Sequence, residues 1–329
     1  MTRRLALLPV LLVLAGCGGG DSSPGTPTRP DPVPSGPTIA CPANVPATTT
    51  GTTAQVAYAA PTASGGQPPV TVACTPASGS LFPLGTTGVS CTATDSLNRQ
   101  ATCSFSVNVV RLPTLQRTSF LAFGDSVTAG EVTVPTSGAT MDGFPSFRLI
   151  IVSAASYPAQ LQTLLRTRYI TQQAAISVAN AGVSGERATQ GAQRFPSVVS
   201  QLRPEVVLLL EGYNDLSLLG AAGITPAAAA IETMARDART RGARVFIASL
   251  TPPRAGGRNT LPADVVTAFN TRLRSVALGE GAVFVDLYQA LVGNVTLYIG
   301  VDGLHPTEVG YQRIAETFFA AVQATLENR

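Results

Sequence analysis

Residues 39–110 carry hydrophobic and polar side chains in short alternating runs. Apolar residues fall on every second position at 70–74, 89–93 and 103–109, which is the pattern of strands with one buried face. Gly and Pro clusters typical of turns separate these runs, and no segment with the 3.6-residue period of a helix interrupts them. The pattern predicts a small all-β sandwich domain over residues 39–112.

From about residue 117 the pattern changes to continuous apolar runs that alternate with helix-like stretches. Continuous apolar runs are typical of parallel strands buried on both faces. The predicted strands cover residues 120–124, 176–179, 206–210, 245–250 and 283–287. The predicted helices cover residues 156–168, 187–202, 226–241, 262–278 and 306–327, with Thr225 and Pro226 as N-cap and first residue of the third. This repetition predicts a three-layer α/β fold with a mainly parallel sheet over residues 117–329.

Residues 1–16 have the features of a secretion signal, since Arg3 and Arg4 precede an apolar run that is too short to span a bilayer. Residues 14–17 read Leu-Ala-Gly-Cys and resemble a bacterial lipobox. The resemblance implies cleavage before Cys17 and acylation of that cysteine, whereas an ordinary signal peptide with a stray cysteine is the alternative. We therefore expect an exported protein, anchored by lipid in the cell envelope at the outer membrane.

Residues 17–38 are predicted to tether the folded part, because Gly, Ser, Thr, Pro and Asp cannot bury enough apolar surface to fold. The formal net charge is +3, and it becomes +1 once Arg3 and Arg4 leave with the signal peptide. A nearly neutral protein has no electrostatic reason to bind nucleic acid. We expect a monomer that contacts the membrane only through Cys17.

Four cysteines remain once Cys17 is acylated: Cys41, Cys74, Cys91 and Cys103. An even number in an exported domain of this size indicates disulfides, and three pairings are open. A metal site is disfavoured, because the spacing is not Cys-x-x-Cys and no histidine lies nearby.

The cysteine-bearing segment also resembles the hyalin (HYR) repeat, an immunoglobulin-like module, through its sequence at residues 74–80, 82–85, 89–95 and 101–105. That resemblance implies the pairs Cys74–Cys91 and Cys41–Cys103. Such modules bind or space other domains, so a surface ligand of this domain is a candidate partner.

Chemically useful residues follow the strands of the predicted parallel sheet. Ser126 lies just beyond the first strand, Gly182 beyond the second and Asn214 beyond the third. Asp302 and His305 precede the last predicted helix, and His305 is the only histidine of the chain. Ligands of such folds bind at the carboxyl ends of the strands, and a serine hydroxyl needs a neighbouring base to become a nucleophile.

These blocks resemble the GDSL, or SGNH, hydrolases, which are named after four motif residues, Ser, Gly, Asn and His. The matching residues here, in the same order, are Ser126, Gly182, Asn214 and His305. The resemblance covers about residues 117–329. It implies a flavodoxin-like sheet and the cleavage of esters or thioesters, without a cofactor or metal.

The expected mechanism is that of a serine esterase acting on acyl esters. Ser126 attacks the carbonyl, His305 transfers the proton, and Asp302 orients the imidazole. The resemblance assigns the oxyanion hole to the backbone N–H groups of Ser126 and Gly182 and to the amide of Asn214. Two further acids, Asp125 and Asp215, are expected to form hydrogen bonds to the backbone instead of taking part in catalysis.

The stretch between Gly130 and Ser156 holds an apolar run at residues 147–152. It predicts either an acyl pocket or lid, or else an edge hairpin or capping loop. Two other functions remain open, a carbohydrate acetylesterase with the same machinery and a surface-binding lipoprotein without activity.

Overall fold

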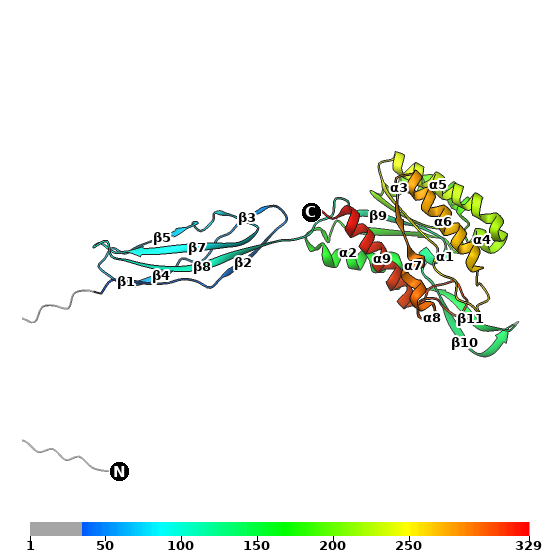
Figure 1. Ribbon diagram of the computed structural model, residues 1–329, viewed down its shortest axis with the longest axis horizontal. Helices are drawn as coiled ribbons and strands as arrows, with labels where there is room; N and C mark the ends of the chain where they lie inside the picture. The colour runs from blue at the N-terminus through cyan, green and yellow to red at the C-terminus, as the bar shows by residue number, and fades with distance from the viewer. Residues whose placement is uncertain (1–34, 142, 329) are drawn as a thin grey trace, which may run out of the picture. The chain divides into compact units, whose positions relative to one another are not determined.

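The computed structural model describes residues 35–141 and 143–328 (Figure 1). The predicted signal peptide, Cys17 and most of the predicted tether lie outside the described residues. Contacts divide the described chain into two compact units. The first holds residues up to 45, 55–81 and 86–107, and the second holds residues 46–54, 82–85 and 108 onwards.

The described chain before residue 112 is all β, as predicted. Its strands are β1 (Pro37–Ala40), β2 (Val45–Thr49), β3 (Thr53–Gln55), β4 (Thr62–Gly65), β5 (Thr71–Thr75), β6 (Leu81–Pro83), β7 (Gly85–Thr94) and β8 (Gln100–Arg111). They form a four-stranded sheet in the order β2-β8-β7-β5 and two pairs, β1-β4 and β3-β6. The first strand begins at Pro37, two residues before the predicted domain boundary.

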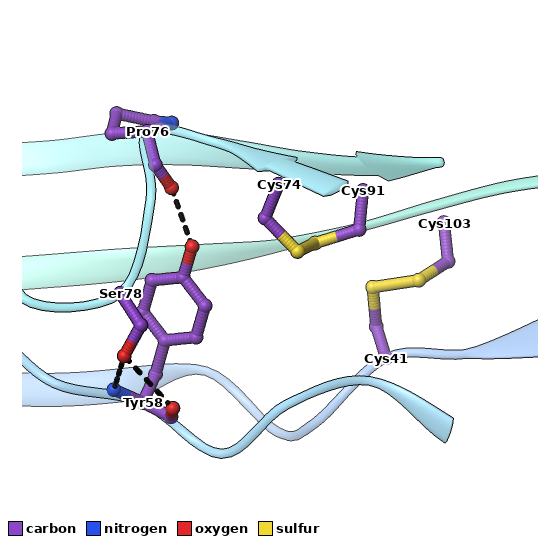
Figure 2. The surroundings of a disulfide bond; sticks show 7 residues. All are labelled: Cys41, Tyr58, Cys74, Pro76, Ser78, Cys91 and Cys103. Atoms are coloured by element: carbon purple, nitrogen blue, oxygen red, sulfur yellow. Dashed lines mark hydrogen bonds between the residues drawn. A yellow bond between two sulfur atoms is a disulfide. The ribbon is translucent and has the colours of Figure 1, made fainter. Parts of the chain in front are cut away.

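Two disulfides join strands and loops of this β region (Figure 2). They connect Cys74 to Cys91 and Cys41 to Cys103, which are the pairs implied by the HYR resemblance. Cys74 and Cys91 are register partners on the antiparallel strands β5 and β7. Close by, the hydroxyl of Tyr58 donates a hydrogen bond to the carbonyl of Pro76 (Figure 2).

A five-stranded parallel sheet forms the centre of the second unit. Its strands are β9 (Ser119–Gly124), β12 (Ser177–Gly182), β13 (Val206–Leu210), β14 (Arg244–Ala248) and β15 (Val283–Val285). Their order is β12-β9-β13-β14-β15, and every neighbouring pair is parallel. In chain order this is 2-1-3-4-5, the flavodoxin-like arrangement that was expected. All five residues of β13 are buried, as its continuous apolar sequence predicts.

Helices cover both faces of this sheet (Figure 1). They are α1 (Ser126–Ala129), α2 (Tyr157–Arg168), α3 (Ala188–Leu202), α4 (Tyr213–Leu219), α5 (Ile224–Thr240), α6 (Ala263–Gly279), α7 (Leu287–Leu291), α8 (Val295–Tyr298) and α9 (Glu308–Leu326), with 3₁₀ turns at 170–172, 220–223 and 292–294. Helix α5 packs between α3 and α6, and α2 packs against α9. Helix α5 buries Ala227, Ile231, Met234 and Ala238, whose spacing of three and four residues places them on one face.

Most predicted boundaries shift by a few residues, and two of the differences have a clear cause. Helix α5 begins at Ile224 with Gly223 as N-cap, so Thr225 lies inside the helix and does not cap it. The preceding 3₁₀ turn at Gly220–Gly223 runs directly into the helix, and this continuity overrides the local capping signal. The last strand ends at Val285 because Asp286 caps helix α7 by accepting a hydrogen bond from the Gln289 N–H.

The insertion after α1 is an antiparallel hairpin of β10 (Glu131–Met141) and β11 (Phe144–Ile151). It extends outward from the α/β core (Figure 1). Glu131 and Ile151 are register partners at its base. Leu149, Ile150 and Ile151 are exposed, so most of the predicted apolar run does not join the core.

Candidate active site

Ser126 lies at the carboxyl end of β9 as the first residue of α1, and it is buried. The turn between strand and helix depends on Gly124, because a Cβ there would lie 2.2 Å from the carbonyl oxygen of Leu210 on the neighbouring strand. Asp125 caps α1 by accepting a hydrogen bond from the Val127 N–H at 3.0 Å. The strand therefore ends in a tight turn that fixes the position of the Ser126 hydroxyl.

His305 lies between Ser126 and Asp302. Its Nε2 is 2.9 Å from the Ser126 Oγ, and its Nδ1 is 2.6 Å from the Asp302 Oδ2. The Asp302 Oδ1 also accepts hydrogen bonds from the backbone N–H groups of Leu304 and His305, at 3.2 and 3.1 Å. The structure thus brings together the three side chains predicted to form the triad, and all three are buried.

A residue that the sequence analysis missed holds Asp302 in place. The Asn259 Nδ2 donates to the Asp302 Oδ2 at 3.0 Å, and the Asn259 backbone N–H donates to the Asp302 carbonyl at 2.7 Å. Nearby, a Cβ at Gly257 would lie 2.2 Å from the Asp302 carbonyl carbon, so this loop needs glycine to approach so closely. Asn259 lies 43 residues before Asp302 in the chain, and nothing in its local sequence indicates this contact.

The pKa values of Asp302 and His305 follow from this geometry. Burial raises the pKa of Asp302, but its hydrogen bond and ion pair with His305 and its other hydrogen bonds outweigh burial, so the pKa is lowered. Burial likewise lowers the pKa of His305, but Asp302 and Glu131 outweigh burial and raise that pKa to about 9. A buried imidazole flanked by carboxylates therefore favours its charged form.

Glu131 is the second functional residue that sequence reasoning missed. Its Oε2 lies 3.3 Å from the His305 Nε2, the same nitrogen that contacts Ser126. It is the first residue of β10, five positions after Ser126. The only signal in the sequence is an acidic residue directly after Gly130, the glycine that ends α1. Without the fold, nothing connects that residue with His305.

The structure places the predicted oxyanion-hole residues at the same edge of the sheet. Gly182 ends β12 and packs against α1, since a Cβ there would lie 2.1 Å from the Ala129 nitrogen. Asn214 lies in the first turn of α4, directly after β13. Here the Gly182 N–H donates to the Asn180 Oδ1 at 2.9 Å, and the Asn214 Nδ2 donates to the Glu186 carbonyl at 2.8 Å. The Gly182 donor must therefore leave or share its partner to reach an oxyanion, whereas the amide nitrogen of Asn214 carries a second hydrogen.

Two buried acids near the site have structural contacts. Asp125 caps α1, and Asp215 accepts a hydrogen bond from the Ala188 N–H at the start of α3, as expected from the sequence. A third, Glu211, follows β13, and its carboxyl group lies beside that of Glu186 without accepting a hydrogen bond from an N–H or hydroxyl donor of the described residues. Burial, followed by the charges of Asp125 and Glu186, raises the pKa of Glu211 well above its usual value.

A groove of about 400 Å³ borders the nucleophile turn. Ala129, Ile151 and Gly182 line its end near α1, and α2 contributes Pro158 and Ala159. Ile151 stands opposite Glu131 across the hairpin, and opposite residues of an antiparallel pair place their side chains on the same face. Gly182 is the one predicted site residue that lines this groove, so the groove meets the site at the carboxyl end of β12.

Within residues 35–141 and 143–328, no group of three or more His, Cys, Asp or Glu side chains is placed to hold a metal ion. The chemistry that this arrangement can perform is nucleophilic attack by a serine activated by histidine. The flavodoxin-like sheet and the Ser–His–Asp geometry at its carboxyl edge define the class as an α/β serine hydrolase.

Comparison with known proteins gives the family. Residues 122–313 match the GDSL-like lipase/acylhydrolase family, and residues 33–109 match the HYR domain. The esterase TesA of Pseudomonas aeruginosa is 28% identical over 166 residues, which is 50% of this chain and 78% of that protein. The chain belongs to the GDSL-like lipase/acylhydrolase family and is a serine hydrolase of ester bonds, preceded by a HYR domain.

Solved structures are similar at lower identity. The lipase/acylhydrolase of Enterococcus faecalis is 22% identical, with a TM-score of 0.49 over 64% of this chain and 97% of that one. A crystal structure of TesA is 22% identical, with a TM-score of 0.47 over 62% of this chain and 98% of that one. An acetylxylan esterase from Geobacillus stearothermophilus is 17% identical, with a TM-score of 0.48 over 63% and 94%.

Proposed function

We propose that the protein is a lipid-anchored, extracytoplasmic esterase that cleaves carboxylic acyl esters with Ser126, His305 and Asp302. The observation that carries this proposal is the continuous contact from the Ser126 Oγ through the His305 ring to the Asp302 Oδ2, at 2.9 and 2.6 Å. These are hydrogen-bond distances at both ring nitrogens, and all three side chains are buried.

In the proposed acylation step, the Ser126 Oγ attacks the ester carbonyl while the His305 Nε2 accepts the hydroxyl proton. The tetrahedral intermediate collapses when His305 gives that proton to the leaving alcohol, and Ser126 keeps the acyl group. Water then attacks the acyl-enzyme, gives one proton to Nε2 and releases the acid, and the proton returns to Ser126. The Nδ1–H of His305 donates its hydrogen bond to Asp302 throughout.

The negative charge on the carbonyl oxygen needs donors at the carboxyl edge of the sheet. We assign them to the backbone N–H groups of Ser126 and Gly182 and to the free amide hydrogen of Asn214. Each such donor contributes about 3–4 kcal/mol to the stability of the transition state in comparable sites. Substrate binding is then expected to replace the Gly182–Asn180 hydrogen bond.

The test of the catalytic roles is hydrolysis of p-nitrophenyl esters by the wild type, Ser126→Ala and His305→Ala. We expect each variant to lose at least about three orders of magnitude in kcat while keeping its fold by circular dichroism. A chelator should leave the wild-type rate unchanged. If Ser126→Ala keeps more than a few per cent of the rate, or if zinc restores chelated enzyme, the serine mechanism is wrong.

The groove that Ala129 and Gly182 line is the candidate acyl-binding site, and its size favours short to medium acyl chains. Ile151 lines it, whereas Leu149, two positions earlier on β11 and also exposed, does not. We therefore expect Ile151→Ser to weaken selection for longer acyl chains, by up to about 0.8 kcal/mol for each methylene that the groove accepts. Leu149→Ser is the matched control and should leave the chain-length profile unchanged.

Two outcomes of that chain-length series would replace this substrate proposal. If acetyl esters react fastest and Ile151→Ser changes nothing, an acetylated sugar becomes the better candidate substrate. If neither set of esters reacts, the inactive surface-binding lipoprotein takes its place. The contact between Ser126 and His305 argues against that last reading, because a site without activity has no need to retain it.

The location rests on the sequence before residue 35. We propose that the Leu-Ala-Gly-Cys segment directs acylation of Cys17, that the predicted linker between Cys17 and β1 tethers the folded part, and that the protein is a monomer in the cell envelope. The HYR domain is proposed to bind a surface ligand or to space the hydrolase from the membrane. Cys17→Ser should move the protein from the membrane fraction to the soluble fraction, and unchanged fractionation would contradict the anchor.

A further inference from the structure

His305 contacts carboxylates at both of its ring nitrogens. Asp302 contacts Nδ1, which is the usual arrangement of a catalytic triad. Glu131 approaches from the other side, with its Oε2 3.3 Å from Nε2, while the Ser126 Oγ lies 2.9 Å from the same Nε2. The acid comes from the hairpin inserted after the nucleophile helix, and the proposed mechanism gives it no role.

The position of Glu131 is fixed from several sides. Its carboxylate also accepts a hydrogen bond from the side chain of Ser184, in the loop after β12. Its backbone carbonyl accepts a hydrogen bond from the Tyr311 hydroxyl of α9 at 2.6 Å. The side chain is largely buried, so solvent screens its interaction with His305 only weakly.

The protonation state of the ring decides what this contact does. When Nε2 carries a proton, the Glu131 carboxylate and the Ser126 oxygen both accept from it. When Nε2 is deprotonated, its lone pair faces the negative Oε2 and the contact becomes repulsive. Glu131 therefore stabilises the imidazolium and destabilises the neutral ring that must accept the Ser126 proton.

We propose that Glu131 is a second carboxylate partner of His305, a positioning residue that holds the imidazolium at Nε2 as Asp302 holds it at Nδ1. The proposal rests on the proposed serine mechanism and extends it. It makes hairpin β10–β11 part of the catalytic machinery, because the first residue of β10 supplies the contact.

The consequence for catalysis depends on pH. Below the pKa of His305, the free enzyme already contains the imidazolium, so Glu131 stabilises the free enzyme and the tetrahedral intermediate alike and gains little in rate. Above that pKa the free enzyme is neutral at His305, and Glu131 stabilises only the intermediate. Glu131 is therefore expected to raise the rate at alkaline pH and to give no gain at neutral pH.

The other charges that act on His305 and Glu131 come from the elements packed around them. Asp302, in the loop before α9, lies against the ring, and Asp125, at the start of α1, interacts electrostatically with it. Asp302 also acts on Glu131 through its charge. Glu131→Gln removes the negative charge of the carboxylate beside Nε2 and leaves Asp302 and Asp125 in place. The variant therefore isolates the effect of the contact between Glu131 and His305.

The first experiment uses the fact that His305 is the only histidine of the chain. In protein purified without a histidine tag, NMR of the single imidazole reports its pKa without assignment, in Ser126→Ala as well as in the wild type. We expect the wild-type ring to titrate near 9 and Glu131→Gln to lower that value by about one unit or more. Glu316→Gln, at a surface acid of α9, is the control and should leave the titration unchanged.

The second experiment is the pH profile of kcat/KM on one p-nitrophenyl ester. For Glu131→Gln we expect the midpoint of the acid limb to fall by the same amount as the NMR pKa. The plateau at high pH should fall by up to about tenfold for each unit of that shift. At low pH the variant should equal or exceed the wild type. A residue with only a structural role would lower the rate at every pH and leave the midpoint in place.

These outcomes separate this inference from the proposed function. If the wild type hydrolyses esters and depends on Ser126, but Glu131→Gln leaves both the NMR pKa and the acid limb unchanged, the role of Glu131 is wrong and the triad stands. If the wild type hydrolyses no ester, the proposed function fails, and the NMR titration still decides whether Glu131 acts on His305.

Discussion

The HYR domain and the hydrolase domain bury carboxylates in opposite ways. In the HYR domain, the buried Asp95 accepts hydrogen bonds from three backbone N–H groups and pairs with the Arg99 guanidinium at 2.7 Å. Burial raises its pKa, but these partners lower it to about 2. In the hydrolase domain, one oxygen of Asp125 and both oxygens of Glu211 accept no hydrogen bond from an N–H or hydroxyl donor among the described residues, and the pKa of each is raised, first by burial.

This difference distinguishes buried acids that stabilise the fold from buried acids that lie near a reactive group. A buried acid that is fully hydrogen-bonded fixes a loop, and its charge is part of the fold. Acids with raised pKa values near a nucleophile mark a region where the fold tolerates electrostatic cost, as active sites commonly do. Asp302 lies in the site but is hydrogen-bonded at both oxygens, and its pKa is lowered as that of Asp95 is.

The largest effect should come from one chemical change made in each domain. Asp302→Asn removes the charge that orients His305 and is expected to lower kcat by about 10⁴-fold, because the amide favours the wrong imidazole tautomer. Asp95→Asn makes the same substitution in the HYR domain and should leave kcat unchanged while lowering the thermal stability of that domain. Steady-state kinetics and thermal melts of both variants measure this, and a large kcat loss in Asp95→Asn would erase the contrast.

The next effect concerns the covalent support of the HYR domain. Replacing Cys74 and Cys91 together by Ser opens a loop with a sequence separation of 17 residues and should lower the stability of the β region by about 2–5 kcal/mol. Hydrogen exchange in β7 and β8 should then become faster, while exchange in β9 and β13 and the esterase rate stay as in the wild type. Loss of esterase activity in the double variant would show that the hydrolase depends on the HYR fold.

The sequence predicted the triad because Ser126 directly follows a predicted strand and Asp302 and His305 directly precede a predicted helix. In α/β folds, functional residues commonly lie at such positions. It did not predict Glu131 or Asn259, because each makes its contact with a residue far along the chain and has no local signature. The predicted start of α5 was wrong because a 3₁₀ turn runs directly into the helix, and the Thr225–Pro226 capping signal does not reveal that turn.

Asn259 offers a smaller effect within the hydrolase domain. Asn259→Ala removes the side-chain hydrogen bond to the Asp302 Oδ2 and should lower kcat by about 10- to 100-fold through a less well oriented imidazole. KM should change little, because Asn259 is expected not to touch substrate. A variant that loses affinity instead, with kcat intact, would place Asn259 in substrate binding and contradict the orienting role.

The smallest effect concerns the unpaired acid. The pKa of Glu211 is raised in the folded state. Its contribution to the free energy of unfolding is therefore fully present below the pKa that Glu211 has in the unfolded chain. That contribution is lost as pH rises toward the pKa that Glu211 has in the folded protein. Glu211→Gln removes that loss, and its melting temperature relative to the wild type should therefore increase from pH 5 to pH 9. A difference that stays constant over this range would mean that Glu211 does not titrate differently in the two states.

The central claim is that Ser126, activated by His305, is the nucleophile. The most direct measurement is mass spectrometry of the protein after reaction with a fluorophosphonate, which bonds to activated serines. The account predicts one adduct per chain, located on the peptide that contains Ser126, with loss of esterase activity in proportion to labelling and no adduct in His305→Ala. An adduct on another residue, or full activity in labelled protein, would contradict it.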